Sequence, residues 1–399
     1  MKIWCFTIIT CLFCAGLTAQ TSDSPSQGVQ PEFGFVLDGV ITSNPDMGLD
    51  SAVKMAELSI SSRIDPYSRG YAIFEFPNLE EVEVAEAVVV FDGFGDGFEI
   101  RAGHMLMDFG KWNTVHEHDQ TMPFGDPVRK ALFGGALKGT GLELHKWLAV
   151  GDTPVRFSLG AWSSVGSHAH GGEGHDEHGD EEEHGGHVGI NSGVDGRKGI
   201  QDWSFSGRLS SQMDMGTNGW WQWGVSYFGS NRGLEADWEN EGDPEDAINT
   251  GYASGEVFGL SARTLGFDLS IYDSSLDSDT WNKATLEYWR HEQDHAHAEG
   301  LATFAEIERS APEGLWLTAE HGFNSEWSMA ASIGQWESEI EEALETSMRY
   351  GLAINHHVSE FDRVRLAVEQ VEQPGLEDEM MVTLQWSSFM GRHRHGLDW

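Results

Sequence analysis

The stretch Val155-Arg-Phe-Ser-Leu-Gly-Ala-Trp162 places apolar side chains at every second position and polar or small ones between them. Met348-Arg-Tyr-Gly-Leu-Ala-Ile-Asn355 repeats this alternation near the other end of the chain. Successive side chains of a β-strand point to opposite faces, so each stretch predicts a strand with one apolar and one polar side.

Segments of this kind return throughout the chain, separated by Gly, Asp, Asn and Pro, and often end in Trp or Tyr. We expect strands over 33–41, 53–63, 69–77, 82–92, 97–104, 137–147, 154–163, 202–211, 219–229, 254–272 with a possible break at Thr264, 281–290, 301–309, 314–322, 346–356, 361–371 and 379–389. The stretch 327–334 could add one or two more. This pattern predicts an all-β fold, a transmembrane antiparallel β-barrel of about 16 strands, between 14 and 18.

The expected connections fall into a short and a long class, as in outer-membrane barrels, where tight turns face the periplasm and longer loops face outward. The tight class holds 150–154, 311–314 and 358–362, and the long class holds 105–136, 164–201, 230–253, 291–300 and 324–345. Aromatic residues near strand ends, such as Trp147, Trp162 and Trp220, are expected at the depth of the lipid headgroups.

The chain begins like an exported protein. Lys2 precedes an apolar run, and Thr18-Ala19 ends it, so we expect a signal peptide over 1–19, a short mobile lead over 20–32 and the barrel over 33–399. A lipid anchor on Cys14 is the alternative, although the bulky Phe13 disfavours it. All three cysteines lie within the expected signal, which leaves the mature chain without disulfides or thiolate ligands. No later segment approaches the roughly 18 apolar residues of a membrane helix, so an exported chain that spans lipid has to be a barrel in the bacterial outer membrane.

The chain carries 24 Lys and Arg against 65 Asp and Glu, a formal net charge of −41. This balance argues against a nucleic-acid partner, because binding phosphate requires a basic surface. It favours cations near the loops, and it is equally consistent with acidic loops that only keep an exposed surface soluble.

The segment from 168 to 187 has the composition of a flexible, solvated loop, with six His, seven Asp or Glu and six Gly. Its histidines are His168, His170, His175, His178, His184 and His187. Imidazole and carboxylate together suit Zn²⁺, and Cu²⁺ or Ni²⁺ as well. Because such a loop loses entropy when it folds around an ion, it suits capture and release. A low-complexity loop without a specific ligand is the alternative.

Two further long connections contain His pairs with one residue between them. These pairs are His116 with His118, and His295 with His297. In an extended chain such a pair projects to one side and could supply two metal ligands. No cofactor is required by any of these patterns, and Zn²⁺ remains the expected metal.

Charged residues also occupy the polar phase of the expected strands, among them Arg156, Arg208, Arg349, Arg365, Glu287, Glu320 and Glu369. They could shape the field of a pore or form ion pairs along its wall. No nucleophile elbow, HExxH helix, P-loop or dinucleotide motif is present, so we expect no enzyme.

Four segments carry a resemblance to a known family. Glu57-Leu-Ser-Ile-Ser-Ser-Arg-Ile-Asp-Pro-Tyr67, Val82-Glu-Val-Ala-Glu-Ala-Val88, Ile100-Arg-Ala-Gly-His-Met-Leu-Met-Asp-Phe-Gly110 and residues 113–127 resemble an uncharacterised, zinc-associated branch of bacterial porin-like outer-membrane proteins. That branch is similar in layout to phosphate-selective porins. The resemblance implies about 16 strands, histidines on outer loops, and passage or capture of small solutes or metal ions. The scarcity of lysine departs from the phosphate-selective pattern.

Together these features predict an outer-membrane channel that passes small solutes or ions and gathers divalent metal, with zinc as the first candidate. A general porin with an incidental His-rich loop and a non-conducting binding or adhesion barrel are the alternatives. The expected partners are membrane lipid, the barrel-assembly machinery and, by analogy with porins, two further copies of the chain in a homotrimer.

Overall fold

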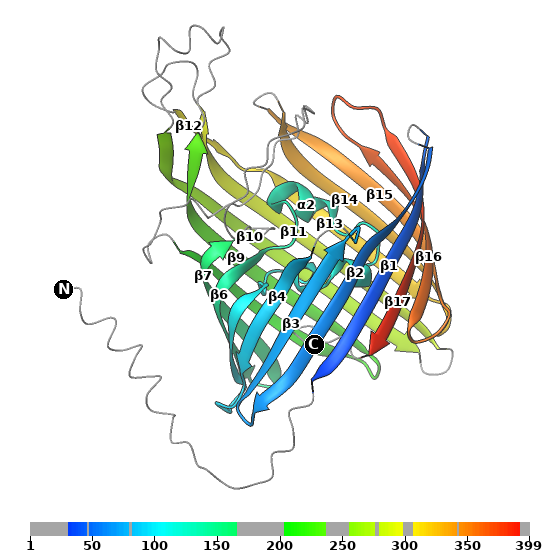
Figure 1. The fold of residues 1–399 in the computed structure, drawn as a ribbon, viewed down its shortest axis with the longest axis horizontal. Coiled ribbons are helices and arrows are strands. Elements are labelled where there is room, and N and C mark those ends of the chain that lie inside the picture. The colour runs from blue at the N-terminus through cyan, green and yellow to red at the C-terminus, as the bar shows by residue number, and fades with distance from the viewer. Residues whose placement is uncertain are drawn as a thin grey trace, which may run out of the picture. The chain divides into compact units, whose positions relative to one another are not determined.

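The computed structural model describes residues 31–45, 48–79, 82–165, 203–236, 255–275, 279–297, 306–340 and 343–391. They form a single β-barrel (Figure 1). The expected signal peptide, all of the expected lead except Pro31 and Glu32, and the six histidines between 168 and 187 lie outside the described residues.

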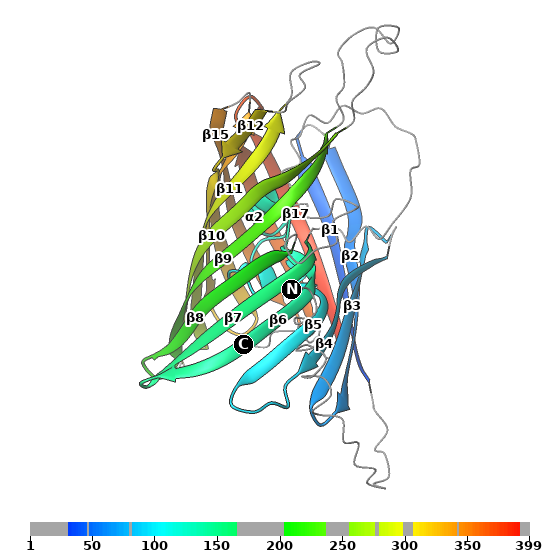
Figure 2. The same cartoon turned by 90° about the vertical axis from the view of Figure 1, so that its left-hand side faces the viewer.

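The barrel wall consists of strands that lie close to the predicted ranges. They are β1 (Glu32–Asn44), β2 (Gly48–Asp65), β3 (Ser68–Pro77), β4 (Glu83–Phe91), β5 (Phe98–Leu106), β6 (Lys138–Val150), β7 (Thr153–Val165), β8 (Ser204–Met215), β9 (Gly219–Ala236), β10 (Gly255–Ser275), β11 (Thr280–His297), β12 (Glu306–Ser310), β13 (Glu313–Gly322), β14 (Trp327–Ile340), β15 (Ala343–His357), β16 (Asp362–Glu372) and β17 (Glu379–Gly391). The strands cross the wall at a slant, as barrel closure requires (Figure 2).

The sheet closes on itself through an antiparallel pairing of its first and last strands. β1 pairs with β17 from Gly34 opposite Gly391 to Ser43 opposite Val382. β12 and β13 both pair with β11, one after the other, so they are two parts of one wall strand. The described wall therefore has 16 strands, and the predicted antiparallel transmembrane β-barrel is confirmed.

Several expected connections are wrong. Residues 291–297, expected to begin a long connection, instead extend β11. Residues 311–314 form no turn, because the break at Pro312 lies within a wall strand and the pairing with β11 continues on both sides of it. The expected loop over 324–345 contains β14, which pairs with both β13 and β15. The possible break at Thr264 is also absent, since β10 runs through this position without interruption.

The two faces of the wall differ as the alternation predicts. On β15, Tyr350 and Leu352 point outward and are 36% and 62% exposed, whereas Arg349 and Ala353 point inward and are buried. The outer face therefore presents an apolar belt to lipid. No helix among the described residues is long and apolar enough to cross a membrane.

The expected headgroup placement of strand-end aromatics has different outcomes. Trp147 is 41% exposed but lies opposite the buried Arg156 in the sheet, so its placement at headgroup depth stays a prediction. Trp162 instead points into the barrel, where it is fully buried and its Nε1 donates a hydrogen bond to Ser206 Oγ at 2.9 Å. The expectation of headgroup depth is therefore wrong for Trp162, because an indole with a polar partner can be buried inside the wall.

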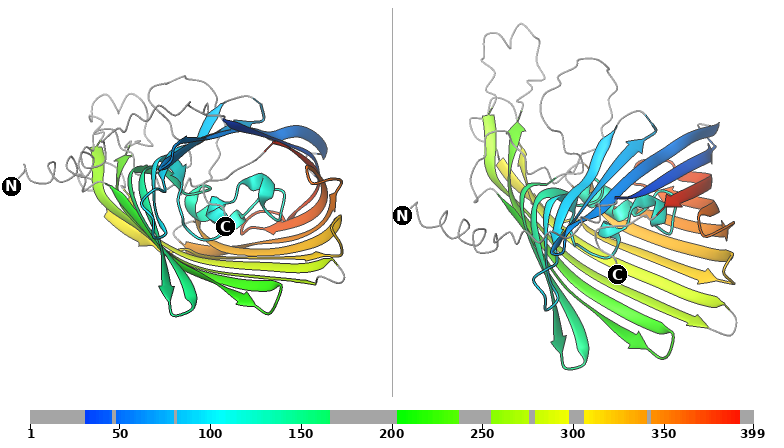
Figure 3. Two further views of the ribbon diagram at one scale, coloured as in Figure 1. Left: turned by 90° about the horizontal axis from the view of Figure 1, so that it is seen from below. Right: turned by 60° about the horizontal axis from the view of Figure 1, so that its bottom comes forward.

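Residues 107–137 connect β5 to β6 and turn into the interior of the barrel, where Figure 3 shows them inside the ring of strands. We call this stretch the lumen segment. It contains the 3-10 helices η1 (Trp112–Thr114) and η2 (Glu117–Asp119) and the helix α2 (Pro127–Phe133). The expectation of an outward-extending long loop over 105–136 is therefore wrong.

Local sequence explains where α2 begins and ends. The side chain of Asp126 caps the helix by accepting hydrogen bonds from the backbone N–H groups of Val128 and Arg129, and Pro127 occupies the first turn. Gly134 ends the helix with a φ of 71°, a left-handed conformation that glycine adopts without strain.

Candidate lumen site

The two ends of the lumen segment are held together by Asn113, which is fully buried. Its side-chain amide donates to the carbonyl oxygens of Met107 and Leu137, both at 2.8 Å, and its Oδ1 accepts from the N–H of Leu137 at 2.7 Å. Buried amides of this kind satisfy backbone groups that have no strand partner. The segment therefore leaves and rejoins the wall at one point.

Apolar side chains join the lumen segment to the inner wall. Phe109 stacks on Trp289 of β11 with ring centroids 4.7 Å apart, and both are buried. Val128 and Leu132 of α2 lie against Gly314 of β13. Full burial of an apolar side chain of this size contributes roughly 1.5–3 kcal/mol. The interior of this barrel is therefore packed along one side.

Gly314 provides a test of this packing, because an added Cβ would lie 2.2 Å from Val128 Cγ1. We expect Gly314→Ala to lower the free energy of unfolding by about 1–3 kcal/mol, as overpacking does. Gly207→Ala is the matched control, since its Cβ would meet Leu159 Cδ2 at an ordinary 3.4 Å. Urea unfolding of the detergent-folded protein measures both, and equal effects would contradict close packing of α2.

Polar contacts from several strands reach the same segment. Glu287 of β11 accepts hydrogen bonds from the backbone N–H groups of Lys111 and Trp112 and pairs with Arg129 at 3.3 Å. Arg365 of β16 donates to the carbonyl oxygen of Gln120 at 3.0 Å. Charged hydrogen bonds are stronger than neutral ones, so these contacts fix the position of the segment across the lumen.

Asp108 lies at the start of the lumen segment between two wall arginines. Its carboxylate lies 3.1 Å from Arg156 Nη2 and 3.6 Å from Arg208 Nε, and its backbone N–H donates to Glu143 at 2.9 Å. Burial alone raises the pKa of Asp108, but the two guanidinium groups lower it to about 2. Of the two alternatives for these wall arginines, the ion-paired arrangement is the one observed.

The other polar-phase residues are paired as well. Arg349 lies 2.6 Å from Glu369, Arg208 also pairs with Asp268 at 2.6 Å, and Glu320 accepts from Asn355 at 3.0 Å. Arg349 and Arg208 therefore lie against carboxylates at close range, whereas Glu320 bonds a neutral amide.

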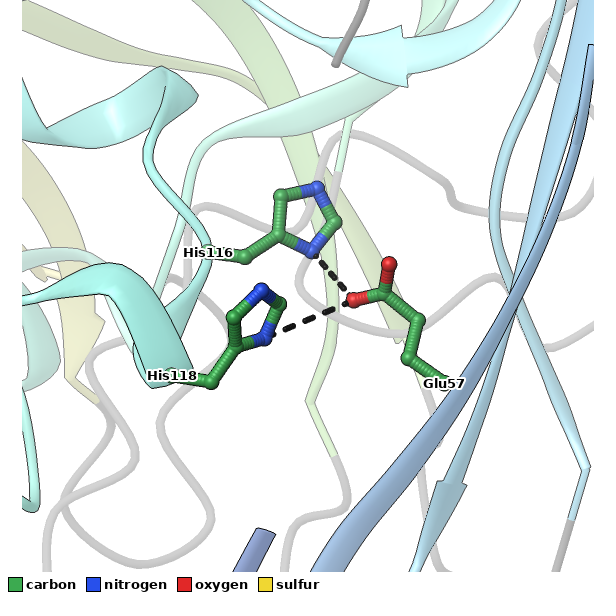
Figure 4. Close-up of side chains that lie close together, drawn as sticks. All are labelled: Glu57, His116 and His118. Carbon is green, nitrogen blue, oxygen red and sulfur yellow. Dashed lines mark ion pairs between the residues drawn. The ribbon is translucent and has the colours of Figure 1, made fainter. Parts of the chain in front are cut away.

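His116 and His118 lie in the same segment and face β2. Their Nδ1 atoms lie 2.9 Å and 3.7 Å from one oxygen of Glu57, as Figure 4 shows. All three side chains are almost fully buried, and one ligand atom from each lies within 4.8 Å of the other two. Two imidazoles and a carboxylate at this spacing form a donor set for a transition-metal cation.

Further carboxylates surround the pair. Glu75 of β3, directly opposite Glu57 in the sheet, has Oε1 3.3 Å from His116 Nδ1. Glu86 of β4 has Oε1 3.7 Å from His116 Nε2. Burial alone lowers the pKa of His116, but these three carboxylates raise it well above its usual value. The cluster therefore attracts positive charge, whether a proton or a metal ion.

A β-bulge directs two side chains of β2 toward this cluster. The register between β1 and β2 skips Lys54, so Lys54 and Glu57 both reach the lumen segment although they are three residues apart. Lys54 pairs with Glu117 at 2.9 Å, next to both histidines. Strict alternation would have placed these two side chains on opposite faces.

Of the ten predicted metal ligands, the structure brings His116 and His118 together, inside the barrel and not on an outer loop. His295 and His297 lie in β11, opposite Glu308 and Glu306 of β12. The remaining six lie outside the described residues. Their role as metal ligands stays a prediction.

Sequence reasoning missed the carboxylates Glu57, Glu75 and Glu86. The alternation along β2 could have identified Glu57. Leu58 and Ile60 are on the apolar, outer phase of this strand, so Glu57 falls on the inner phase. Nothing in the sequence pairs it with the histidines.

A closed antiparallel 16-strand barrel with an inward segment is a porin-like fold. No protein-family model matches the chain. An uncharacterised protein of Aquifex aeolicus (strain VF5) is 34% identical over 106 residues, which cover 26% of this chain and only 21% of that protein.

Solved structures with the same fold share little sequence with the chain. OmpT, an outer membrane protein of Vibrio cholerae, in its trimer form has a TM-score of 0.54 at 8% identity, covering 91% of this chain and 100% of that one. Pseudomonas putida OprB at high pH has a TM-score of 0.57 at 9% identity, covering 91% and 94%. The anion-selective porin from Comamonas acidovorans has a TM-score of 0.52 at 10% identity, covering 91% and 100%. These likenesses concern the fold.

Proposed function

We propose that this protein is a passive channel of the bacterial outer membrane that passes small solutes or ions. One observation supports it above all: a closed barrel with an apolar outer face has its lumen narrowed by an inward segment rich in charged contacts. The proposal includes no catalysis. It adds that the His-rich segment gathers divalent metal, zinc in particular, at the outer mouth.

The proposed partners follow from the fold. The apolar outer belt suits membrane lipid, and the barrel-assembly machinery would insert it. A homotrimer is proposed as well, in keeping with OmpT in its trimer form.

A second candidate function is a non-conducting binding barrel. It is favoured by the buried cluster inside the wall, in which Phe109, Phe133 and Trp289 pack in mutual ring contact. Planar-bilayer recording separates the two functions. Discrete current steps support the channel, and silence from a folded protein supports the second candidate.

Metal gathering has its own test. A full-length variant in which all six histidines of 168–187 become asparagine is expected to bind fewer zinc ions per chain than the parent, since the imidazole ligands are gone. Metal analysis after equilibrium dialysis counts the ions. An unchanged count would contradict metal gathering and support the alternative, a general porin with an incidental His-rich loop.

A further inference from the structure

We propose that Glu57, His116 and His118, with Glu75 as a fourth ligand, bind one transition-metal cation of the zinc type inside the barrel. This site is separate from the His-rich segment. It depends neither on conduction nor on the gathering role proposed above.

The donor atoms already have the spacing of such a site. A tetrahedral zinc ion with ligands at 2.0–2.1 Å keeps its donors about 3.3 Å apart. His116 Nδ1 lies 2.9 Å from Glu57 Oε2 and 3.3 Å from Glu75 Oε1, and His118 Nδ1 lies 3.7 Å from Glu57 Oε2. These three separations bracket that value, and one ligand atom from each of Glu57, His116 and His118 lies within 4.8 Å of the other two.

The outer side of each imidazole also fits a metal site. While Nδ1 faces the shared carboxylate, His116 Nε2 lies 3.7 Å from Glu86 and His118 Nε2 lies 3.4 Å from Asp119. A ligating histidine commonly donates its second N–H to a carboxylate, which fixes the ring and its tautomer. Both histidines have this second partner.

The wall fixes the carboxylate behind His116. Glu86 accepts a hydrogen bond from the backbone N–H of Leu106 at 3.1 Å and lies 3.4 Å from Arg101 Nη2. It is therefore fully engaged on the side away from the imidazole and cannot turn toward the ion. This arrangement leaves Glu57 and Glu75 as the carboxylate ligands.

The donor types select the class of cation. Two imidazole nitrogens with carboxylate oxygens suit Zn²⁺, Cu²⁺ or Ni²⁺, whereas Ca²⁺ and Mg²⁺ prefer oxygen ligands alone. An ion would reach the site from the side of Glu75, whose side chain is 20% exposed, because Glu57 and both histidines are almost fully buried. A bound ion would join the lumen segment to β2 and β3.

The test uses full-length protein in which the eight other predicted metal-ligand histidines are replaced by asparagine (H168N, H170N, H175N, H178N, H184N, H187N, H295N, H297N). Isothermal titration with zinc chloride in detergent is expected to show one site per chain. The additional double change His116→Ala with His118→Ala should abolish that site. Glu57→Gln, which keeps the shape of the side chain, should weaken zinc roughly tenfold or more.

His321→Ala is the matched control, because this histidine bonds Asn282 and lies apart from the cluster. It should leave zinc binding unchanged. Heat-modifiable migration on gels establishes that each variant is folded. The proposal would be overturned if the folded background protein, which lacks the eight other predicted ligand histidines, binds no zinc. It would also be overturned if zinc binds equally after loss of His116 and His118. Neither result would alter the bilayer current on which the channel proposal depends.

Discussion

A variant in which a four-residue linker replaces residues 108–136 is expected to pass several times more current per channel than the parent protein. The linker can close the hairpin because Leu106 and Lys138 are register partners, and the N–H of Met107 donates to Leu137 O at 3.0 Å. Removal of the lumen segment widens the water-filled cross-section, and current rises with that area. Single-channel recording in planar bilayers measures the change.

A milder change tests the same idea without a deletion. Glu287→Gln weakens the charged contacts to Arg129 and to the backbone of Lys111 and Trp112, so we expect more frequent current fluctuations at nearly unchanged mean current. Glu313→Gln is the control, because this partly exposed carboxylate bonds Tyr288 and Arg290 on the wall.

For the deletion, a folded variant with parental conductance would show that the lumen segment does not limit the current.

Arg101→Leu is expected to cause the largest loss of stability among single substitutions. Arg101 is 1% exposed and lies 2.8 Å from Glu143 and 3.4 Å from Glu86, both of them buried. Removing one partner of a buried ion pair leaves uncompensated charge and costs about 3–5 kcal/mol. We expect the folded fraction in detergent to fall sharply, as measured by urea titration with heat-modifiability as the readout.

Arg290→Leu is the matched control for this loss. Arg290 pairs with Glu292 and Glu313, but its side chain is 46% exposed, so solvent screens the interaction. Exposed pairs contribute about 0–1 kcal/mol. Similar losses for both variants would contradict a structural role for buried charge. Partial recovery in Arg101→Leu with Glu143→Gln would trace the loss to the unpaired carboxylate.

The wall was predictable because its two sides meet different surroundings. Alternation placed a strand at 361–371, and β16 covers Asp362–Glu372. It failed at 311–314 because a proline can end a strand or interrupt one, and only the length of the neighbouring strand distinguishes the two. β11 continues to His297, which gives β12 a partner beyond Pro312.

The lumen segment was found in the sequence only as a connection. Its inward path depends on contacts with Trp289, Glu287 and Arg365, which come from strands much later in the chain. No local pattern reports such contacts. Two of its histidines were singled out from their spacing, yet the spacing gave no sign that they would be buried.

The sequence by itself determined the barrel. Its apolar and polar side chains alternate at every second residue, and only strands place one set against lipid and the other against polar contacts inside the barrel. Tertiary structure alone decided the lumen site. Glu57 meets His116 and His118 because closure of the wall and a bulge at Lys54 bring β2 to the inward segment. Periodicity fixes the face of the wall on which a side chain lies. Distances between side chains across the lumen depend on closure of the whole barrel.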